Sequence, residues 1–279
     1  MENFICVQCG TQFAETAGPP PRCPICEDER QFVRHAGQEW TTLEHLAADH
    51  HNRFEEEAPS LLGIGTEPEF AIGQRALLLQ SPGGNLLWDC ISLLDDQTAA
   101  EIDARGGVRA IAISHPHFYT TMVDWADHFD AQIFLHAADR EWVMRPADTG
   151  SRIQFWEGTT LSLWDGMTLI NCGGHFEGGT VLHWSAASRD GGSKGALLTG
   201  DIITVVQDRR YVSFMRSYPN LIPLGAMAIR RIVERIELFT FEQIYGGWWK
   251  ANVLSDAKAA VTRSAQRYLR AIASAENCG

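Results

Sequence analysis

Two histidines separated by one residue, His115 and His117, have the spacing of a pair of metal ligands. They come directly after the apolar run 110–113, which we predict to be a buried strand. Side chains alternate along an extended chain, so the two imidazoles point in the same direction, and Pro116 between them stiffens the turn. Two imidazoles held in this way can chelate one divalent cation, although a solvated turn is an alternative interpretation.

A third histidine and one aspartate occupy similar positions later in the chain. His175 lies among glycines in the segment 173–179, shortly after the apolar run 167–170. Asp201 ends the apolar run 196–200. Each candidate ligand therefore follows a different predicted strand, which is how active sites are assembled on layered α/β scaffolds.

Four cysteines near the N-terminus form two Cys-x-x-Cys pairs, Cys6 with Cys9 and Cys23 with Cys26. Two such pairs place four thiolates tetrahedrally around one ion. Residues 1–35, which we call the knuckle, are too few to bury a sufficient core, so the ion would supply the folding free energy. The knuckle resembles a zinc ribbon or rubredoxin, where iron uses the same ligands as zinc. Disulfides are the less favoured alternative in a reducing compartment.

The predicted elements divide the chain into three parts. The knuckle comprises residues 1–35, a helix and a linker occupy residues 36–60, and the main domain spans residues 61–279. In the second part, residues 41–44 form a capping box that opens a short helix. Three consecutive glutamates before Pro59 indicate the linker.

Apolar runs and amphipathic segments alternate along the main domain. Strands are predicted over 70–80, 85–89, 110–113, 133–136, 181–184 and 197–201. Helices are predicted over 98–105, 121–129, 226–238 and 255–275, and a hairpin loop over 188–195. This pattern supports a fold of alternating strands and helices with antiparallel features. Cys90 and Cys172 follow strands and are expected to be buried and inert.

The ordered set of motifs resembles the metallo-β-lactamase superfamily. That superfamily has His-x-His after a strand, then Gly-His-x-x-Gly, then Gly-Asp after a further strand. The corresponding segments here are His115-Pro-His117, Gly174-His175-Phe-Glu-Gly178 and Gly200-Asp201. Upstream, Leu86-Leu-Trp-Asp89 resembles the early strand of the superfamily that ends in Asp, and Tyr245-Gly-Gly247 stands where the superfamily usually has His-Gly-Gly. The resemblance covers roughly residue 62 to the C-terminus. It implies an α+β fold, the αββα sandwich of two mixed sheets with helices outside.

The chain departs from the superfamily pattern at the second metal site. The usual motif is His-x-His-x-Asp-His, and Tyr119 and Thr120 stand where Asp and His would bind a second ion. Tyr245 stands where the last family histidine would be. The resemblance therefore implies one catalytic ion, bound by the three histidines and the bridging aspartate described above. We expect zinc, because three imidazoles with an open position make a catalytic zinc site.

The predicted activity is hydrolysis of a small carbonyl compound such as a lactone, ester, thioester or amide. Zinc lowers the pKa of water toward neutrality and so produces a hydroxide nucleophile. Asp201 either completes the coordination shell or accepts a proton from the water. Tyr119 or Tyr245 donates a hydrogen bond to the developing oxyanion. Asp89 orients a ligand histidine through the second ring nitrogen, and a strand-end cap is an equal alternative.

Two other functions stay open. His115, His175 and Asp201 match the two-histidine-one-carboxylate iron site of persulfide dioxygenases in this superfamily. The protein would otherwise be a non-enzymatic metal-binding scaffold. We interpret His50 as part of a polar helix end rather than as a ligand. Asp124 is interpreted as a helix cap rather than as a replacement for the missing carboxylate.

Composition limits the expected partners. The 279 residues carry a net charge of −12, so we do not expect nucleic acid to bind. The sequence opens on Met1-Glu2 and has no long apolar segment, so we expect neither a signal peptide nor membrane attachment, and a cytoplasmic protein. A small-molecule substrate is predicted, together with a protein partner that the knuckle would bind.

Overall fold

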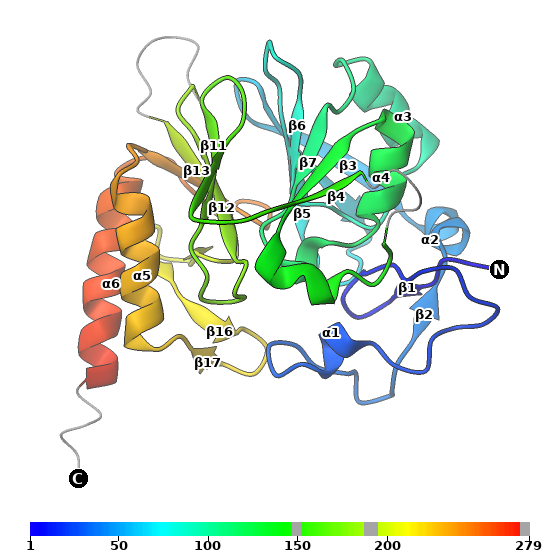
Figure 1. Ribbon diagram of the computed structural model, residues 1–279, viewed down its shortest axis with the longest axis horizontal. Helices are drawn as coiled ribbons and strands as arrows, with labels where there is room; N and C mark the ends of the chain where they lie inside the picture. Colours follow the sequence, from blue (N-terminus) through cyan, green and yellow to red (C-terminus); the bar gives the residue numbers. More distant parts are fainter. Residues whose placement is uncertain (147–151, 187–194, 274–279) are drawn as a thin grey trace. The chain divides into compact units, whose positions relative to one another are not determined.

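The computed structural model describes residues 1–146, 152–186 and 195–273. They divide into two compact units, Met1–Glu157 and Gly158–Gly279. Each unit is built on its own sheet, and Figure 1 shows the elements of both. The hairpin loop predicted over 188–195 lies, except for Gly195, outside the described residues.

The sheet of the first unit has seven strands in the order β3-β4-β5-β6-β7-β8-β9. Strands β3 to β6 are antiparallel, whereas β6 to β9 run parallel. The apolar runs of the sequence form its centre, because every residue of β5, β6 and β7 is buried. The bounds are β3 His51–Ala58, β4 Leu61–Glu67, β5 Arg75–Leu79, β6 Leu86–Trp88, β7 Ala110–Ala112, β8 Gln132–His136 and β9 Ile153–Trp156.

Helices connect the parallel strands. Helix α3 (Asp96–Asp103) joins β6 to β7, and α4 (Met122–Phe129) joins β7 to β8. Helix α3 begins at Asp95, whose side chain accepts the amide of Thr98 at 2.7 Å. Parallel neighbours end at the same edge of a sheet, so the residues that follow β6 and β7 lie next to each other.

The knuckle is part of the first unit. Strand β1 (Ile5–Cys6) pairs with β2 (Trp40–Thr41), and the short helix α1 (Pro24–Glu27) carries the second cysteine pair. The expected boundaries at 35 and 60 therefore fall inside one compact unit. Helix α2 (Leu43–Asp49) begins at Thr42, which accepts the amide of His45 at 3.3 Å, one residue later than the capping box predicted.

The linker predicted around the three glutamates is wrong, because these residues lie in β3. Their strand pairs with β4 along its whole length. It is an edge strand of the sheet, and charged side chains are common on edge strands because they prevent pairing with other chains. Glu57 also forms an ion pair with Arg75, which is 1% exposed. The run of glutamates that indicated a linker is thus part of an edge strand.

The sheet of the second unit has six strands in the order β10-β11-β12-β13-β18-β19. Strands β13 and β18 run parallel, and the other neighbours are antiparallel. The bounds are β10 Thr160–Ser162, β11 Met167–Asn171, β12 Thr180–Trp184, β13 Ala196–Gly200, β18 Gln243–Gly246 and β19 Asn252–Val253. Two hairpins follow β13, namely β14 (Thr204–Val205) with β15 (Val212–Ser213), and β16 (Met215–Ser217) with β17 (Ile222–Pro223).

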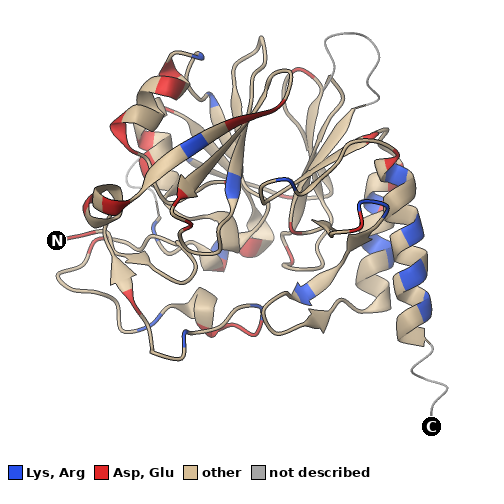
Figure 2. Ribbon diagram, turned by 180° about the vertical axis from the view of Figure 1, so that it is seen from behind, with Lys and Arg blue, Asp and Glu red and all other residues tan. Residues whose placement is uncertain are grey.

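Helices α5 (Ala226–Glu237) and α6 (Ala257–Ala273) confirm the two predicted amphipathic segments. Their apolar residues, including Ile229, Ile232 and Val261, share one core with Leu197 and Ile244 of the sheet. Both helices carry Lys or Arg residues (Figure 2), and α6 contains four of them and no acidic residue. No helix in the described ranges is long and apolar enough to cross a membrane.

Candidate metal centres

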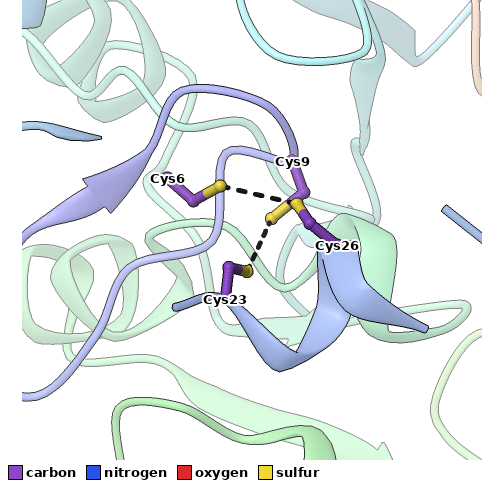
Figure 3. Close-up of side chains that lie close together, drawn as sticks. All are labelled: Cys6, Cys9, Cys23 and Cys26. Carbon is purple, nitrogen blue, oxygen red and sulfur yellow. Dashed lines mark hydrogen bonds between the residues drawn. The ribbon is translucent and has the colours of Figure 1, made fainter. Parts of the chain in front are cut away.

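The four knuckle cysteines converge on one point (Figure 3). All four are buried, and their sulfur atoms lie within 4.8 Å of one another. The Sγ–Sγ distances are 3.6 Å for Cys6 and Cys26 and 3.7 Å for Cys9 and Cys23. Four zinc–sulfur bonds of about 2.3 Å in a tetrahedron would separate the sulfurs by about 3.8 Å. The cluster therefore fits one four-thiolate ion.

The thiols of this cluster perturb one another strongly. The hydrogen bond with Cys23 holds the pKa of Cys6 far below its usual range, whereas hydrogen bonds with the same residue raise the pKa of Cys9 and Cys26. These opposed shifts arise because the four buried thiols are in close contact. Gln38 Nε2 donates a hydrogen bond to Cys6 Sγ at 3.0 Å, a contact that stabilises a thiolate. A buried thiolate among thiols is a strong site for a cation, which binds the deprotonated form.

Cys90 and Cys172 are buried away from the cluster, as predicted. Burial raises the pKa of each thiol to about 12, so both stay protonated at neutral pH. None of the six described cysteines forms a disulfide, and Cys278 lies outside the described residues.

The histidine pair lies in the turn that follows β7. His115 and His117 are 1% and 3% exposed, and their ring centroids are 5.1 Å apart with the planes at 75°. The turn is tight, because the amide of Phe118 donates to the carbonyl of His115 at 3.1 Å and that of Tyr119 to Pro116 at 3.2 Å. The two imidazoles are therefore held close together in a buried position, which fits a chelating pair better than a solvated turn.

Ser114 and Asp89 support this turn. Ser114 Oγ lies 2.9 Å from His115 Nδ1, and the amide of Ser114 donates to Asp89 Oδ1 at 2.7 Å. Burial raises the pKa of Asp89 to about 7, although the amide and hydroxyl of Ser114 oppose the shift. We expected Asp89 to contact a ligand histidine, but its carboxylate acts through Ser114. Sequence reasoning missed this serine, although it directly precedes His115.

The residues after the pair face the knuckle. Tyr119 and Thr120 line a cavity of about 10 Å³ together with Thr11 and Gln12. Tyr119 is 2% exposed, and burial raises the pKa of its hydroxyl well above the usual range. The contacts of Tyr119 in this small buried cavity do not support its predicted role as a hydrogen-bond donor to the oxyanion.

Asp124 was predicted to cap α4, and that prediction is wrong. Its carboxylate forms an ion pair with Arg145 and accepts a hydrogen bond from Gln12 Nε2 at 2.8 Å. The hydroxyl of Thr121, at the start of the helix, donates to the carbonyls of Ile91 and Ser92 at 3.2 and 3.0 Å. Both side chains of the supposed capping box therefore make tertiary contacts.

In the second unit, His175 and Asp201 lie at one edge of the sheet. Strand β12 runs antiparallel to β13, so the turn that precedes β12 lies beside the end of β13. His175 is in that turn, and Asp201 directly follows β13. His175 Nε2 and Asp201 Oδ2 are 3.9 Å apart and both residues are buried. This distance is too long for a hydrogen bond but allows one ion about 2.1 Å from each atom.

The other ring nitrogen of His175, Nδ1, lies 3.2 Å from the carbonyl oxygen of Met215. Metal-bound histidines commonly donate this second N–H to a backbone carbonyl, which fixes the tautomer and leaves Nε2 to bind the ion. The glycines around His175 shape its turn. Gly173 and Gly174 have φ of +62° and +89°, and a Cβ on Gly179 would lie 2.7 Å from the carbonyl of Gly173.

Tyr218 is a neighbour of this pair that sequence reasoning did not assign. Its hydroxyl donates to the carbonyl of Asp201 at 2.8 Å and contacts the hydroxyl of Thr204. Its ring centroid is 5.9 Å from that of His175, and burial raises the pKa of the phenol well above the usual range. Tyr245 donates to Gln243 Oε1 at 3.2 Å, two residues back along β18.

No known family profile matches the sequence. The uncharacterized protein YmaE of Bacillus subtilis (strain 168) is 49% identical over 274 residues, which are 98% of this chain and 97% of that protein. Three solved structures share the fold at low identity. A metallo-β-lactamase of Cronobacter sakazakii with a mutated HARLDQ motif is 19% identical, with a TM-score of 0.51 over 81% of this chain and 99% of that one. VMB-1 is 11% identical, with a TM-score of 0.58 over 80% of this chain and 98% of that one. A B3 metallo-β-lactamase with an active-site glutamic acid is 13% identical, with a TM-score of 0.53 over 83% of this chain and 92% of that one. The chain therefore belongs to the family of Bacillus subtilis YmaE and has the metallo-β-lactamase fold, with a four-cysteine knuckle at its N-terminus.

Proposed function

We propose that His115, His117, His175 and Asp201 together hold one metal ion, and that the protein is a metal-dependent hydrolase. The observation that carries this proposal is the 3.9 Å separation of His175 Nε2 and Asp201 Oδ2, two buried atoms that an ion would join. The buried His115–His117 pair is the natural complement, because the metallo-β-lactamase fold uses both segments as ligands of one site. Three imidazoles and one carboxylate suit zinc.

Two arrangements hold the imidazoles for this task. Ser114 Oγ contacts Nδ1 of His115 at 2.9 Å, and the carbonyl of Met215 contacts Nδ1 of His175 at 3.2 Å. Each contact engages Nδ1, so Nε2 is the atom that each ring offers to an ion. The Asp89 carboxylate fixes Ser114 in turn. Such support raises the basicity of the ligands and prevents the rings from rotating.

The substrate class we propose is a small carbonyl compound, namely a lactone, ester, thioester or amide. When bound, the ion would polarise the carbonyl and lower the pKa of a water molecule. The buried carboxylate of Asp201 would help to hold the ion or accept a proton from such a water. Tyr218 fixes the backbone of Asp201 by donating to its carbonyl oxygen, so the carboxylate keeps its place at the end of β13.

The knuckle would hold a second, structural ion. Its four sulfurs are about as far apart as a tetrahedral site requires, and all four cysteines are buried. Zinc is the proposed ion, and iron would use the same four thiolates. The proposed partners are a small-molecule substrate and a protein that binds the knuckle.

Metal content tests the proposal. Purified wild type should contain two ions per chain by mass spectrometry, and a His115→Ala/His175→Ala variant should retain one. The same variant should lose hydrolysis of any compound that wild type cleaves in a panel of lactones, esters, thioesters and amides. His183→Ala is the matched control, because His183 is also buried but donates from Nε2 to the carbonyl of Thr240 at 2.8 Å. It should retain both ions.

Two outcomes would contradict this scheme. A wild-type protein with one ion, unchanged in the double variant, would mean that the histidines bind none. Iron in place of the ion that the double variant loses, with retention in His117→Ala, would instead indicate a site built from His115, His175 and Asp201 and oxygen chemistry.

A further inference from the structure

The knuckle contacts the segment that follows the histidine pair. Gly10 accepts a hydrogen bond from Ser92 Oγ at 2.9 Å through its carbonyl. The amide of Gln12 donates to the carbonyl of Thr120 at 3.0 Å. The side-chain amide of Gln12 donates to Asp124 in the first turn of α4 at 2.8 Å. Two of these hydrogen bonds connect Gln12 to the segment that follows His117, and the third connects Gly10 to Ser92, which follows β6.

The cysteine cluster fixes where these contacts are made. Gly10 directly follows Cys9, and its amide donates to the carbonyl of Cys6 at 2.8 Å. The amide of Cys6 donates in turn to the carbonyl of Thr11 at 2.9 Å. Gly10 has φ of +78°, and a Cβ there would lie 2.5 Å from Ser92 Oγ. An ion that binds Cys6 and Cys9 therefore sets the position of the Gly10 carbonyl and of the Gln12 amide.

The contacted turn needs such support. Thr120 has φ of +39°, a left-handed conformation that a β-branched residue adopts only when its surroundings impose it. Its carbonyl is held by Gln12, and the next residue, Thr121, donates to the carbonyls of Ile91 and Ser92. Thr120 lies three residues after His117, so its backbone conformation determines how the chain leaves the histidine turn.

Ser92 connects the two regions. Its hydroxyl donates to the knuckle at Gly10, and its carbonyl accepts from Thr121 at 3.0 Å. Three residues earlier, Asp89 accepts the amide of Ser114, directly before His115. The segment 89–92 therefore holds the histidine turn at both of its ends, and the knuckle holds that segment. All of these residues lie in the first compact unit.

We propose that the metal-loaded knuckle is the positioning element of the His115–His117 turn. Through Gly10 and Gln12 it imposes the disfavoured conformation of Thr120, and loss of its ion releases the turn. A released turn binds an ion more weakly, because the two imidazoles are no longer held together before binding. The weaker binding rests on the proposed function, whereas the release of the turn does not.

Amide hydrogen exchange tests the release of the turn. Mass spectrometry of a peptide that covers residues 114–122 should show at least tenfold faster exchange in Ser92→Ala and in Cys23→Ser/Cys26→Ser than in wild type. Ser92→Thr keeps the hydroxyl and should restore slow exchange. Ser264→Ala is the control, because Ser264 is equally buried and hydrogen-bonded but belongs to α6. Exchange in β5 should stay unchanged, which separates local release from unfolding. Unchanged exchange over 114–122 in both knuckle-directed variants would overturn the proposal.

Cobalt substitution tests the effect on the ion. Thiolate-to-cobalt charge-transfer bands report the knuckle, and the weaker visible bands of a histidine-bound ion report the second site. Ser92→Ala should leave the thiolate bands unchanged and lower the affinity of the histidine site for cobalt about tenfold. Equal affinity in Ser92→Ala and wild type would overturn the coupling. A wild type without a histidine-bound cobalt would contradict the proposed function alone, and the exchange experiment would still decide whether the knuckle positions the turn.

Discussion

Replacement of Asp89 by asparagine should stabilise the protein above neutral pH and leave it nearly unchanged in acid. Asp89 is 1% exposed and has φ of +60°, a conformation that asparagine also tolerates. The amide oxygen of asparagine can still accept the hydrogen bond from Ser114. The variant therefore removes the ionisation of this side chain and keeps its main contact.

The size of the effect follows from the pKa. Burial raises the pKa of Asp89 from 3.8 to about 7 in the folded protein, so the folded state binds this proton more tightly than the unfolded state. Stability must then fall as pH rises from about 4 to about 7. A difference of about three units corresponds to about 4 kcal/mol at pH 8, at about 1.36 kcal/mol per unit. A bound cation nearby would favour the carboxylate, so this value is an upper limit.

Urea unfolding of wild type and Asp89→Asn at pH 4.5, 6 and 8 measures the effect. The variant's gain in unfolding free energy should grow from about 1 kcal/mol at pH 4.5 to at most about 4 kcal/mol at pH 8. Asp130→Asn is a suitable control, because Asp130 also has positive φ, at 54°, but its side chain is 92% exposed. A difference between wild type and Asp89→Asn that is equal at pH 4.5 and pH 8 would refute the argument, as would a loss of stability at pH 8.

Three other substitutions test the residues that support His115, His175 and Asp201. Ser114→Ala removes the hydroxyl next to His115 Nδ1 and should lower zinc affinity about tenfold in a chelator competition assay, with the knuckle ion retained. Tyr218→Phe leaves the buried carbonyl of Asp201 without this donor and should cost about 1–2 kcal/mol in urea unfolding, with two ions still present by mass spectrometry. Gly179→Ala places a Cβ 2.7 Å from the carbonyl of Gly173, in the turn that contains His175, so metal analysis should find one ion instead of two.

The sequence predicted the features that depend on local order along the chain. The apolar run before His115 is β7, and the glycines around His175 form a tight turn beside the end of β13. Both follow from residue types and spacing over fewer than ten positions. The convergence of the two Cys-x-x-Cys pairs, 14 to 20 residues apart, followed instead from the chemistry of a four-thiolate site. The fold class followed from the order of these motifs, and the solved structures that share the fold confirm it.

Features that depend on distant contacts could not be predicted in this way. Asp124 has the spacing of a helix cap, but Gln12 and Arg145 provide partners 112 and 21 residues away. The glutamates of β3 resemble a linker until their strand is placed at a sheet edge. Tyr218 has no motif around it, and only the fold brings its hydroxyl to the carbonyl of Asp201. In each case a long-range partner outweighs the local propensity.

The knuckle combines a feature that is local in sequence, its cysteine spacing, with contacts to distant residues. From its ligand spacing it resembled an independent appendage, because four cysteines can organise a short chain without other contacts. The structure instead places Thr11 and Gln12 against Tyr119 and Thr120. These are the two positions where the superfamily pattern has ligands of a second ion. The knuckle is therefore packed against the segment that departs from the superfamily pattern, a contact that its cysteine spacing alone does not indicate.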